Sequence, residues 1–76
     1  MKHVRTRIVE LMARKQEKTR KIVDVATIME NTGLSRPTVT NWVKGRVRRF
    51  DEDTIVRFCE YFDCDVGDLM TLAEDN

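Results

Sequence analysis

The sequence predicts an all-α fold, a compact arrangement of five short helices. Three observations predict it: apolar residues recur at helical spacing, Asp or Ser stands before several apolar runs, and no segment shows a convincing strand pattern. The chain has 76 residues, with one proline and three glycines, which is typical of short helices joined by tight turns. Its length is that of one domain, so we expect a single domain spanning residues 1–76.

The first helix is expected from about Val4 to Glu17. Its buried stripe follows a helical spacing and comprises Val4, Ile8, Leu11 and Met12. The polar run "KQEKTRK" breaks that pattern, and we interpret it as the frayed helix end and a loop.

The second helix is expected to begin after Asp24, which is a favourable N-cap, and to stop at Gly33, which can adopt a left-handed conformation. Val23, before the cap, is placed to pack on Ile28. The inward side chains of this helix are expected to be Val25, Ile28 and Met29.

The third helix is expected to begin after Ser35 as N-cap, with Pro37 in the first turn, and to end near Gly45. At about 100° per residue, one arc is apolar and the opposite arc is polar. The apolar arc holds Val39, Trp42 and Val43, and the polar arc holds Arg36, Pro37, Thr40, Asn41 and Lys44. Trp42 is therefore expected in the core; the alternative is that it stacks on a nucleobase.

Asp51 is expected to cap a fourth helix, whose inner stripe comprises Ile55, Phe58, Cys59 and Phe62. Tyr61 lies off that stripe and is expected to be an exposed or partner-facing ring. Asp65 is expected to cap a short fifth helix that holds Val66, Leu69 and Met70.

Charge is distributed unevenly along the chain. Residues 1–49 hold 13 Lys or Arg and 4 Asp or Glu, whereas residues 50–76 hold one Arg and 9 Asp or Glu. The balance is therefore +9 in the first part and −8 in the second, so the molecule should have a basic end suited to a polyanion and an acidic end held away from it. The alternative is that the charges merely cluster on solvated helix faces.

Enzymatic, cofactor and metal functions have little support in the sequence. The carboxylates stand at caps and on outer helix faces, no nucleophile is paired with a base, and no Gly-rich phosphate loop occurs. A zinc site needs about four ligands, and only His3, Cys59 and Cys64 are soft candidates. No apolar run approaches the length of a membrane span and the N-terminus has no signal-peptide pattern, so a cytoplasmic protein is expected.

A helix, a Gly-containing turn and a second capped helix, over residues of about 24–45, form a helix-turn-helix pattern. The second helix of such a unit enters the major groove of DNA, held by an apolar edge and presenting hydrogen-bonding side chains on its other side. Between Ser35 and Phe50 there are five Lys or Arg and no acidic residue, which favours contact with phosphate.

The segments "TGLSRPTVTNWVKG" and "DTIVRFCEYFDCDVGDLM" resemble the Cro/C1-type (XRE-family) DNA-binding domain of bacterial and phage transcription regulators. The resemblance covers nearly the whole chain. It implies a compact five-helix, lambda-repressor-like domain that binds operator DNA, usually as a two-fold dimer.

The resemblance also implies roles for individual residues. The family's base-reading positions fall on Arg36, Pro37, Thr40 and Asn41. Its positions that contact the DNA backbone fall on Ser35, Thr38, Lys44, Arg46, Arg48 and Arg49. The chain departs from the family in three places. It has Val25 where the family often has a Gln that contacts phosphate, Met29 where Ala is common, and a longer connection between the first two helices, "RKQEKTRKIVD". Arg20 and Lys21 in that connection are candidates to replace the phosphate contact of the missing Gln.

The sequence thus predicts a sequence-specific regulator of transcription that binds a double-stranded operator as a homodimer. The family resemblance implies that it is a repressor, and we expect no cofactor, metal or small-molecule ligand. The dimer surface is expected near Val66, Met70 and Leu72, at the acidic end. The alternative hypothesis is a protein-interaction module, antitoxin-like or scaffold-like, in which DNA binding is secondary or lost.

Overall fold

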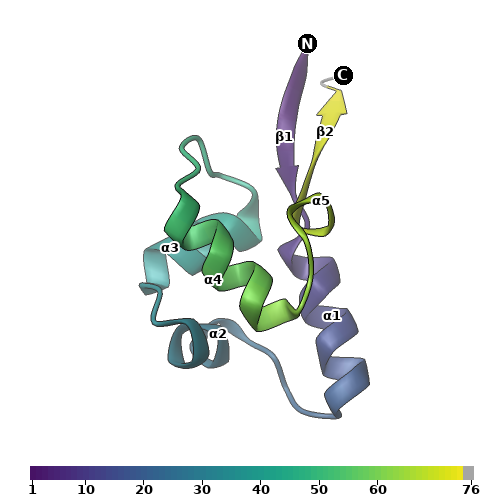
Figure 1. The fold of residues 1–76 in the computed structure, drawn as a ribbon, viewed down its shortest axis with the longest axis vertical. Helices are drawn as coiled ribbons and strands as arrows, with labels where there is room; N and C mark the ends of the chain where they lie inside the picture. Colours follow the sequence, from purple (N-terminus) through teal and green to yellow (C-terminus); the bar gives the residue numbers. More distant parts are fainter. Residues whose placement is uncertain (75–76) are drawn as a thin grey trace.

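The structure, a computed structural model, describes residues 1–74 and contains five helices and a two-stranded antiparallel sheet (Figure 1). The elements, in chain order, are β1 (Lys2–Thr6), α1 (Ile8–Thr19), α2 (Val25–Thr32), α3 (Arg36–Lys44), α4 (Glu52–Phe62), α5 (Val66–Leu69) and β2 (Met70–Glu74). The five predicted helices are confirmed. The all-α prediction is wrong, because the two ends of the described chain form a sheet.

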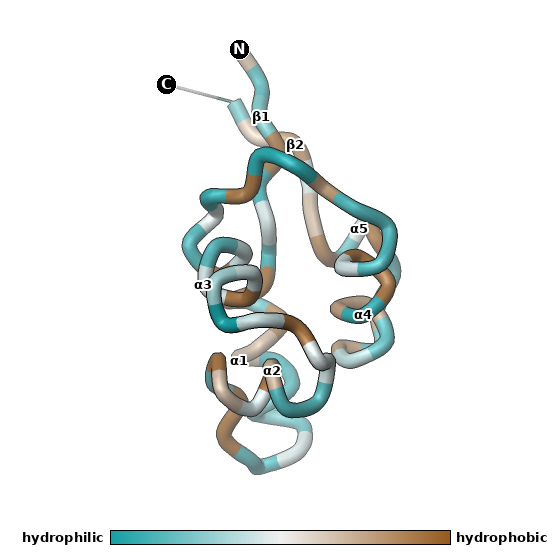
Figure 2. Tube along the Cα trace, turned by 90° about the vertical axis from the view of Figure 1, so that its left-hand side faces the viewer, coloured by the Kyte–Doolittle hydropathy of each residue, from teal (hydrophilic) through white to brown (hydrophobic). Residues whose placement is uncertain are grey.

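In that sheet β1 pairs with β2 from Lys2 opposite Glu74 to Thr6 opposite Met70, forming a ribbon that extends from the helices at the end of the molecule opposite α2 (Figures 1 and 2). Val4 therefore lies in β1 facing Leu72, and not in the first helix. Its spacing of four from Ile8 imitates a helical repeat, whereas the strand depends on a partner some seventy residues away in sequence.

The starts of α2, α3, α4 and α5 are where the local signals predict them, whereas α1 starts at Ile8 and not at Val4. At three N-caps the side-chain oxygen accepts a hydrogen bond from the backbone N–H three residues later: Asp24 from Thr27 at 2.8 Å, Ser35 from Thr38 at 3.4 Å, and Asp51 from Thr54 at 2.9 Å. At the start of α5, the Asp65 N–H donates to the Asp68 carboxylate at 3.2 Å. Each of these bonds satisfies a backbone or side-chain group that the helix itself leaves unpaired.

The connection between α1 and α2 is shorter than the sequence suggests. Helix α1 continues to Thr19, two residues past the predicted end, and Arg20 ends it in a left-handed conformation with φ 61°. The Gln16 side chain accepts a hydrogen bond from the Val23 N–H at 3.0 Å, which fixes the return of the chain toward α2.

Trp42 lies at the centre of the core, with only 3% of its surface exposed. Its ring centroid is 4.9 Å from that of Phe58 and 5.5 Å from that of Phe50, the latter in an edge-on arrangement that aromatic pairs favour. The prediction that Trp42 is a core residue is confirmed. The buried hydrophobic residues of the described chain are Ile8, Leu11, Val23, Ile28, Val39, Trp42, Phe58 and Leu69.

Tyr61 differs from its prediction as an exposed ring. It is half-buried and packs edge-on against Phe62 with 4.9 Å between ring centroids, while the Lys15 ammonium lies 4.6 Å from the Tyr61 ring centroid. Burial raises the pKa of the Tyr61 hydroxyl. The ring and the Tyr61 carbonyl therefore contact Lys15 of α1, and the ring is partly and not fully exposed.

Three glycines allow a matched test of the turns. Gly33 and Gly45 have φ values of 76° and 69°, where a side chain is strained, and a Cβ on Gly33 would also lie 3.0 Å from Arg57 Nη1. Gly67 has no such φ, and a Cβ there would meet open space. We expect Gly45→Ala to lower the free energy of unfolding by about 1 kcal/mol, Gly33→Ala to lower it further, and Gly67→Ala to leave it unchanged or raise it slightly. Urea unfolding of the three variants measures this order, and equal effects at Gly33 and Gly67 would contradict it.

The N-caps make stability depend on pH. Hydrogen bonds from Thr27 and Thr54 lower the pKa values of Asp24 and Asp51 below the ordinary value of 3.8. The stability they confer is present above that value and is lost as the pH falls through the lowered pKa of the folded state. We expect Asp51→Asn, which keeps a capping oxygen but does not titrate, to lose less unfolding free energy than the unaltered protein between about pH 5 and pH 2. Chemical denaturation across this range tests the difference; identical pH slopes would exclude a contribution from Asp51.

Candidate nucleic-acid interface

Helix α3 turns its polar arc toward solvent and its apolar edge toward the core. Val39 and Trp42 are buried, with 0% and 3% of their surfaces exposed. The residues expected to meet bases are accessible: Arg36, Pro37 and Asn41 are exposed and Thr40 is half-buried. The amphipathic arrangement predicted for this helix is therefore confirmed, whereas contact with bases remains a prediction.

The first turn of α3 is organised by hydroxyl groups. Ser35 Oγ and Thr38 Oγ1 lie 2.9 Å apart and share a hydrogen bond, and Ser35 Oγ also accepts the Thr38 N–H. Ser35 is exposed and Thr38 is half-buried, so both hydroxyls lie at the N-terminal end of a helix, where backbone N–H groups and the helix dipole favour an anion.

One carboxylate lies near this turn. The pKa of Asp24 is lowered chiefly by its hydrogen bonds from Thr27, and the nearby positive charge of Arg36 lowers it further. Asp24 is on the cap of α2, outside the acid-free stretch from Ser35 to Phe50. Its charge opposes the attraction of Arg36 for phosphate, which sequence spacing alone did not reveal.

The connection from α3 to α4 carries Arg46, Arg48 and Arg49, all exposed. The Arg46 N–H donates to the Asn41 carbonyl at 2.9 Å, and this bond closes the C-terminal end of α3 just past Gly45. A surface hollow brings five of the predicted site residues together, and its lining comprises Thr38, Asn41, Trp42, Arg46, Val47, Arg48, Arg49, Asp51 and Thr54.

The other predicted residues lie apart from this hollow. Lys44 is exposed at the C-terminal end of α3 and lines a different hollow, with Val4 and Thr6 of β1. Ser35, Arg36, Pro37 and Thr40 line neither hollow. The structure therefore presents the ten residues along the length of α3 and its following connection, and not as one pocket, which is the shape needed to follow a groove of DNA.

The start of α2 has no polar side chain of the kind that the family uses there. Val25 begins α2 and is half-buried, and its side chain has no hydrogen-bond donor. Arg20 and Lys21 are exposed between α1 and α2. Their contact with DNA remains a prediction.

Sequence reasoning missed two residues that hold the helix-turn-helix from outside, Thr6 of β1 and Arg57 of α4. Thr6 Oγ1 donates to the Trp42 carbonyl at 2.6 Å, and Arg57 Nη1 donates to the Thr32 carbonyl at 2.7 Å. One sequence signal was present for Arg57, which is the single Arg or Lys after Arg49.

The two thiols are brought close but remain unmodified. The Cys64 N–H donates to the Cys59 carbonyl at 3.0 Å, and neither cysteine is in a disulfide. Burial raises the pKa of both thiols, that of Cys64 to about 11, so both are protonated near neutral pH. Within residues 1–74 no group of three or more His, Cys, Asp or Glu is placed to hold a metal ion.

Among the described helices, none combines the length and the hydropathy needed to cross a membrane.

Searches of curated proteins and of solved structures find no match to the chain. The profile of the Cro/C1-type HTH DNA-binding domain matches residues 7–75, which include all five helices and β2. The chain therefore belongs to the Cro/C1-type helix-turn-helix family of DNA-binding domains.

Proposed function

We propose that this protein is a sequence-specific regulator of transcription, acting as a repressor, whose helix α3 reads the major groove of double-stranded DNA. The observation that carries the proposal is the division of α3: its Val39 and Trp42 edge is buried, while its polar arc is exposed and free of acid. We further propose that residues 1–76 act as one domain in the cytoplasm of a bacterium or its phage, bound to the nucleoid, without catalysis, cofactor or small-molecule ligand.

Base recognition follows from side-chain chemistry. Arginine can donate two hydrogen bonds to O6 and N7 of guanine, and asparagine can bond adenine at N6 and N7. Arg36 and Asn41 have these groups in exposed positions at the start and middle of α3. Pro37 and the half-buried Thr40 offer apolar surface to a thymine methyl.

Phosphate contacts hold the helix in register. Ser35 and Thr38 offer hydroxyls near the start of α3, and Lys44, Arg46, Arg48 and Arg49 offer positive charge at and beyond its end. Each cation that neutralises a phosphate releases counterions, so affinity should fall steeply with salt. The start of α4 would lie close to the duplex in this arrangement, because Asp51 and Thr54 line the same hollow as Asn41 and the three arginines.

We expect Arg36→Ala to weaken binding to a preferred duplex by about 1–3 kcal/mol while changing nonspecific binding little, because the lost contact is to a base edge. Lys18→Ala, a loss of one positive charge at an exposed position on α1, is the matched control and should have little effect. Fluorescence anisotropy on a duplex selected from a random pool, and on an unrelated duplex, gives both affinities.

The salt dependence of the same measurements tests the function itself. A log–log slope of several units is expected for binding to either duplex. If the protein binds no duplex even at low salt, the proposed function is wrong. If Arg36→Ala lowers both affinities equally, Arg36 contacts phosphate only.

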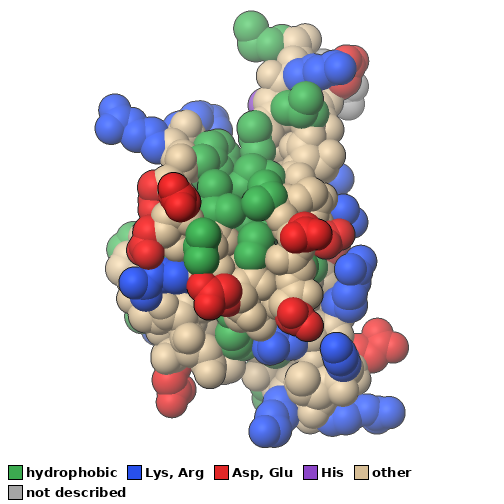
Figure 3. All heavy atoms as spheres, in the orientation of Figure 1, with side chains coloured by type: hydrophobic (Ala, Val, Ile, Leu, Met, Phe, Trp, Pro, Cys, Tyr) green, Lys and Arg blue, Asp and Glu red, His purple; other side chains and the backbone are tan. Residues whose placement is uncertain are grey.

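We also propose that the protein binds its operator as a homodimer, with two α3 helices about 34 Å apart. The surface we assign to the dimer is an apolar notch between the ribbon and the α3–α4 connection, where Figure 3 shows hydrophobic side chains gathered. A hollow there is lined partly by Val4, Val47 and Phe50, and Val4 faces Leu72 across the ribbon.

This notch is consistent with the expected dimer surface. Val66 and Leu72 have 50% and 64% of their surfaces exposed, and Met70 is half-buried. Met70 was expected in the fifth helix, but α5 ends at Leu69, so Met70 lies in β2 together with Leu72. A two-stranded ribbon alone is marginal in water, so burial against a second copy would stabilise it.

We therefore expect Leu72→Lys to shift the protein toward the monomer and to weaken binding to a two-half-site duplex more than to a single half-site. Ile22→Lys is the control, since Ile22 is 73% exposed and lies at the α1–α2 connection. Sedimentation equilibrium measures the association. A wild-type protein that is monomeric both free and on the two-half-site duplex would overturn the dimer proposal.

One observation favours the protein-interaction module as a second candidate. Acidic side chains flank the apolar notch on both sides in Figure 3. They would repel the same acidic side chains of a second copy, but they would attract a segment of another protein that is both basic and apolar. The two candidates differ in duplex binding: the regulator binds DNA with a steep salt dependence, whereas the interaction module need not bind at all.

A further inference from the structure

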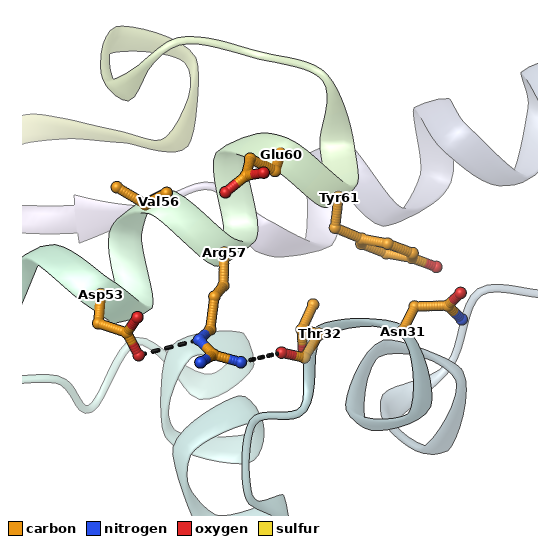
Figure 4. A pocket seen from close by; sticks show the side chains of 7 residues that line it. All are labelled: Asn31, Thr32, Asp53, Val56, Arg57, Glu60 and Tyr61. Carbon is orange, nitrogen blue, oxygen red and sulfur yellow. Dashed lines mark hydrogen bonds and ion pairs between the residues drawn. The ribbon is translucent and has the colours of Figure 1, made fainter.

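An arginine from outside the helix-turn-helix bonds the end of α2, just before the turn that leads into α3. Arg57 extends from α4 toward the turn between α2 and α3, where its Nη1 donates to the Thr32 carbonyl at 2.7 Å (Figure 4). Its Nε donates to Asp53 Oδ2 at 2.9 Å. Because Asp53 stands one turn earlier on α4, the carboxylate holds the guanidinium in the orientation that reaches α2.

The bond falls on a backbone group that needs a partner. Thr32 is the last residue of α2, so no backbone N–H of that helix can donate to the Thr32 carbonyl. The Thr32 residue is 8% exposed, and its own hydroxyl is already used, donating to the Ile28 carbonyl at 2.6 Å and accepting the Leu34 N–H at 3.2 Å. Arg57 therefore satisfies a poorly solvated carbonyl at the point where the chain turns from α2 into α3.

The turn is shaped to admit this arginine. Gly33 follows Thr32 with φ 76°, and a Cβ at Gly33 would come within 3.0 Å of Arg57 Nη1. The missing side chain lets the guanidinium approach the backbone. The glycine thus serves both the left-handed helix end and the contact with α4.

The other end of α3 is held by the ribbon. Thr6 Oγ1, at the end of β1, donates to the Trp42 carbonyl at 2.6 Å. That carbonyl lies in the last turn of α3 and also accepts the Gly45 N–H at 3.3 Å. Arg57 therefore bonds the backbone just before α3, and Thr6 bonds the backbone at the C-terminal end of α3.

We propose that Arg57 and Thr6 are positioning residues that set the orientation of α3, and through it the discrimination between DNA sequences. The effect on sequence discrimination rests on the proposed function, that α3 reads the major groove. Base contacts need α3 in a narrow range of orientations, whereas phosphate contacts tolerate displacement. The two hydrogen bonds fix that orientation from α4 and from the ribbon. Neither side chain needs to touch DNA.

The test uses two conservative changes. Arg57→Lys keeps the charge but lacks the planar fork that bonds Asp53 and the Thr32 carbonyl together. Thr6→Val keeps the branched shape suited to a strand and removes only the hydroxyl. Each has a matched control: Arg14→Lys on an exposed site of α1, and Thr71→Val on an exposed site of β2.

The first readout is the ratio of affinities for a selected and an unrelated duplex, measured at a temperature where circular dichroism shows every variant folded. We expect each variant to lower this ratio about threefold to tenfold, as the loss of one hydrogen bond implies, and the controls to leave it unchanged. Because every variant is folded under these conditions, a purely structural role would leave the ratio unchanged, and an unchanged ratio in both variants would overturn the proposal.

The second readout needs no DNA. Residual dipolar couplings of backbone amides report the orientation of α3 relative to α4 in the free protein, and we expect them to change in Arg57→Lys and Thr6→Val but not in the controls. If the wild-type protein has no preferred duplex, the proposed function fails while these couplings still decide whether the two residues orient α3. Couplings identical to wild type in both variants would overturn the positioning role.

Discussion

The burial of Trp42 is the constraint on which the rest of the structure depends. Trp42 belongs to the helix that carries the candidate interface, yet its ring lies against Phe58 of α4 and Phe50 of the preceding connection. Replacing a buried aromatic residue by alanine typically costs about 3–5 kcal/mol, against a total stability of about 5–15 kcal/mol for a small domain. A nine-residue helix would be marginal alone, so the same contact that builds the core also keeps α3 folded and presented.

The direction of α3 then follows from that contact. With Trp42 and Val39 inward, the helical repeat turns Arg36 and Asn41 outward and leaves the connection with Arg46, Arg48 and Arg49 on the surface. The acidic part of the chain forms α4, α5 and β2. Charge is less segregated in space than along the sequence, because basic Arg14, Lys15 and Lys18 of α1 line a hollow with Asp63 and Asp68. The α2 cap likewise brings Asp24 near Arg36.

The parts of this fold that could be predicted from sequence are those with local causes. The caps at Asp24, Ser35 and Asp51 depend on a side chain and an N–H three residues apart, and the Trp42 arc depends on helical spacing within one element. The ribbon could not be predicted this way, because "KHVRT" and "MTLAE" become strands only through each other. The bonds from Thr6 and Arg57 have the same origin, since both cross between elements and 25 or more residues separate their partners. Helical spacing predicted that the polar arc of α3 is exposed, because exposure depends on one helix and the core beneath it. Contacts with DNA depend on a second molecule, so spacing within the chain does not determine them.

The most direct test of the central claim, that α3 enters the major groove, is methylation protection on a duplex selected by the protein. Dimethyl sulfate methylates guanine at N7, in the major groove, and adenine at N3, in the minor groove. The account predicts protection of guanine N7 in the selected site and little change at adenine N3, with the guanine protection lost in Arg36→Ala. Protection confined to adenine N3, or specific binding with no protection at any guanine of the site, would contradict it.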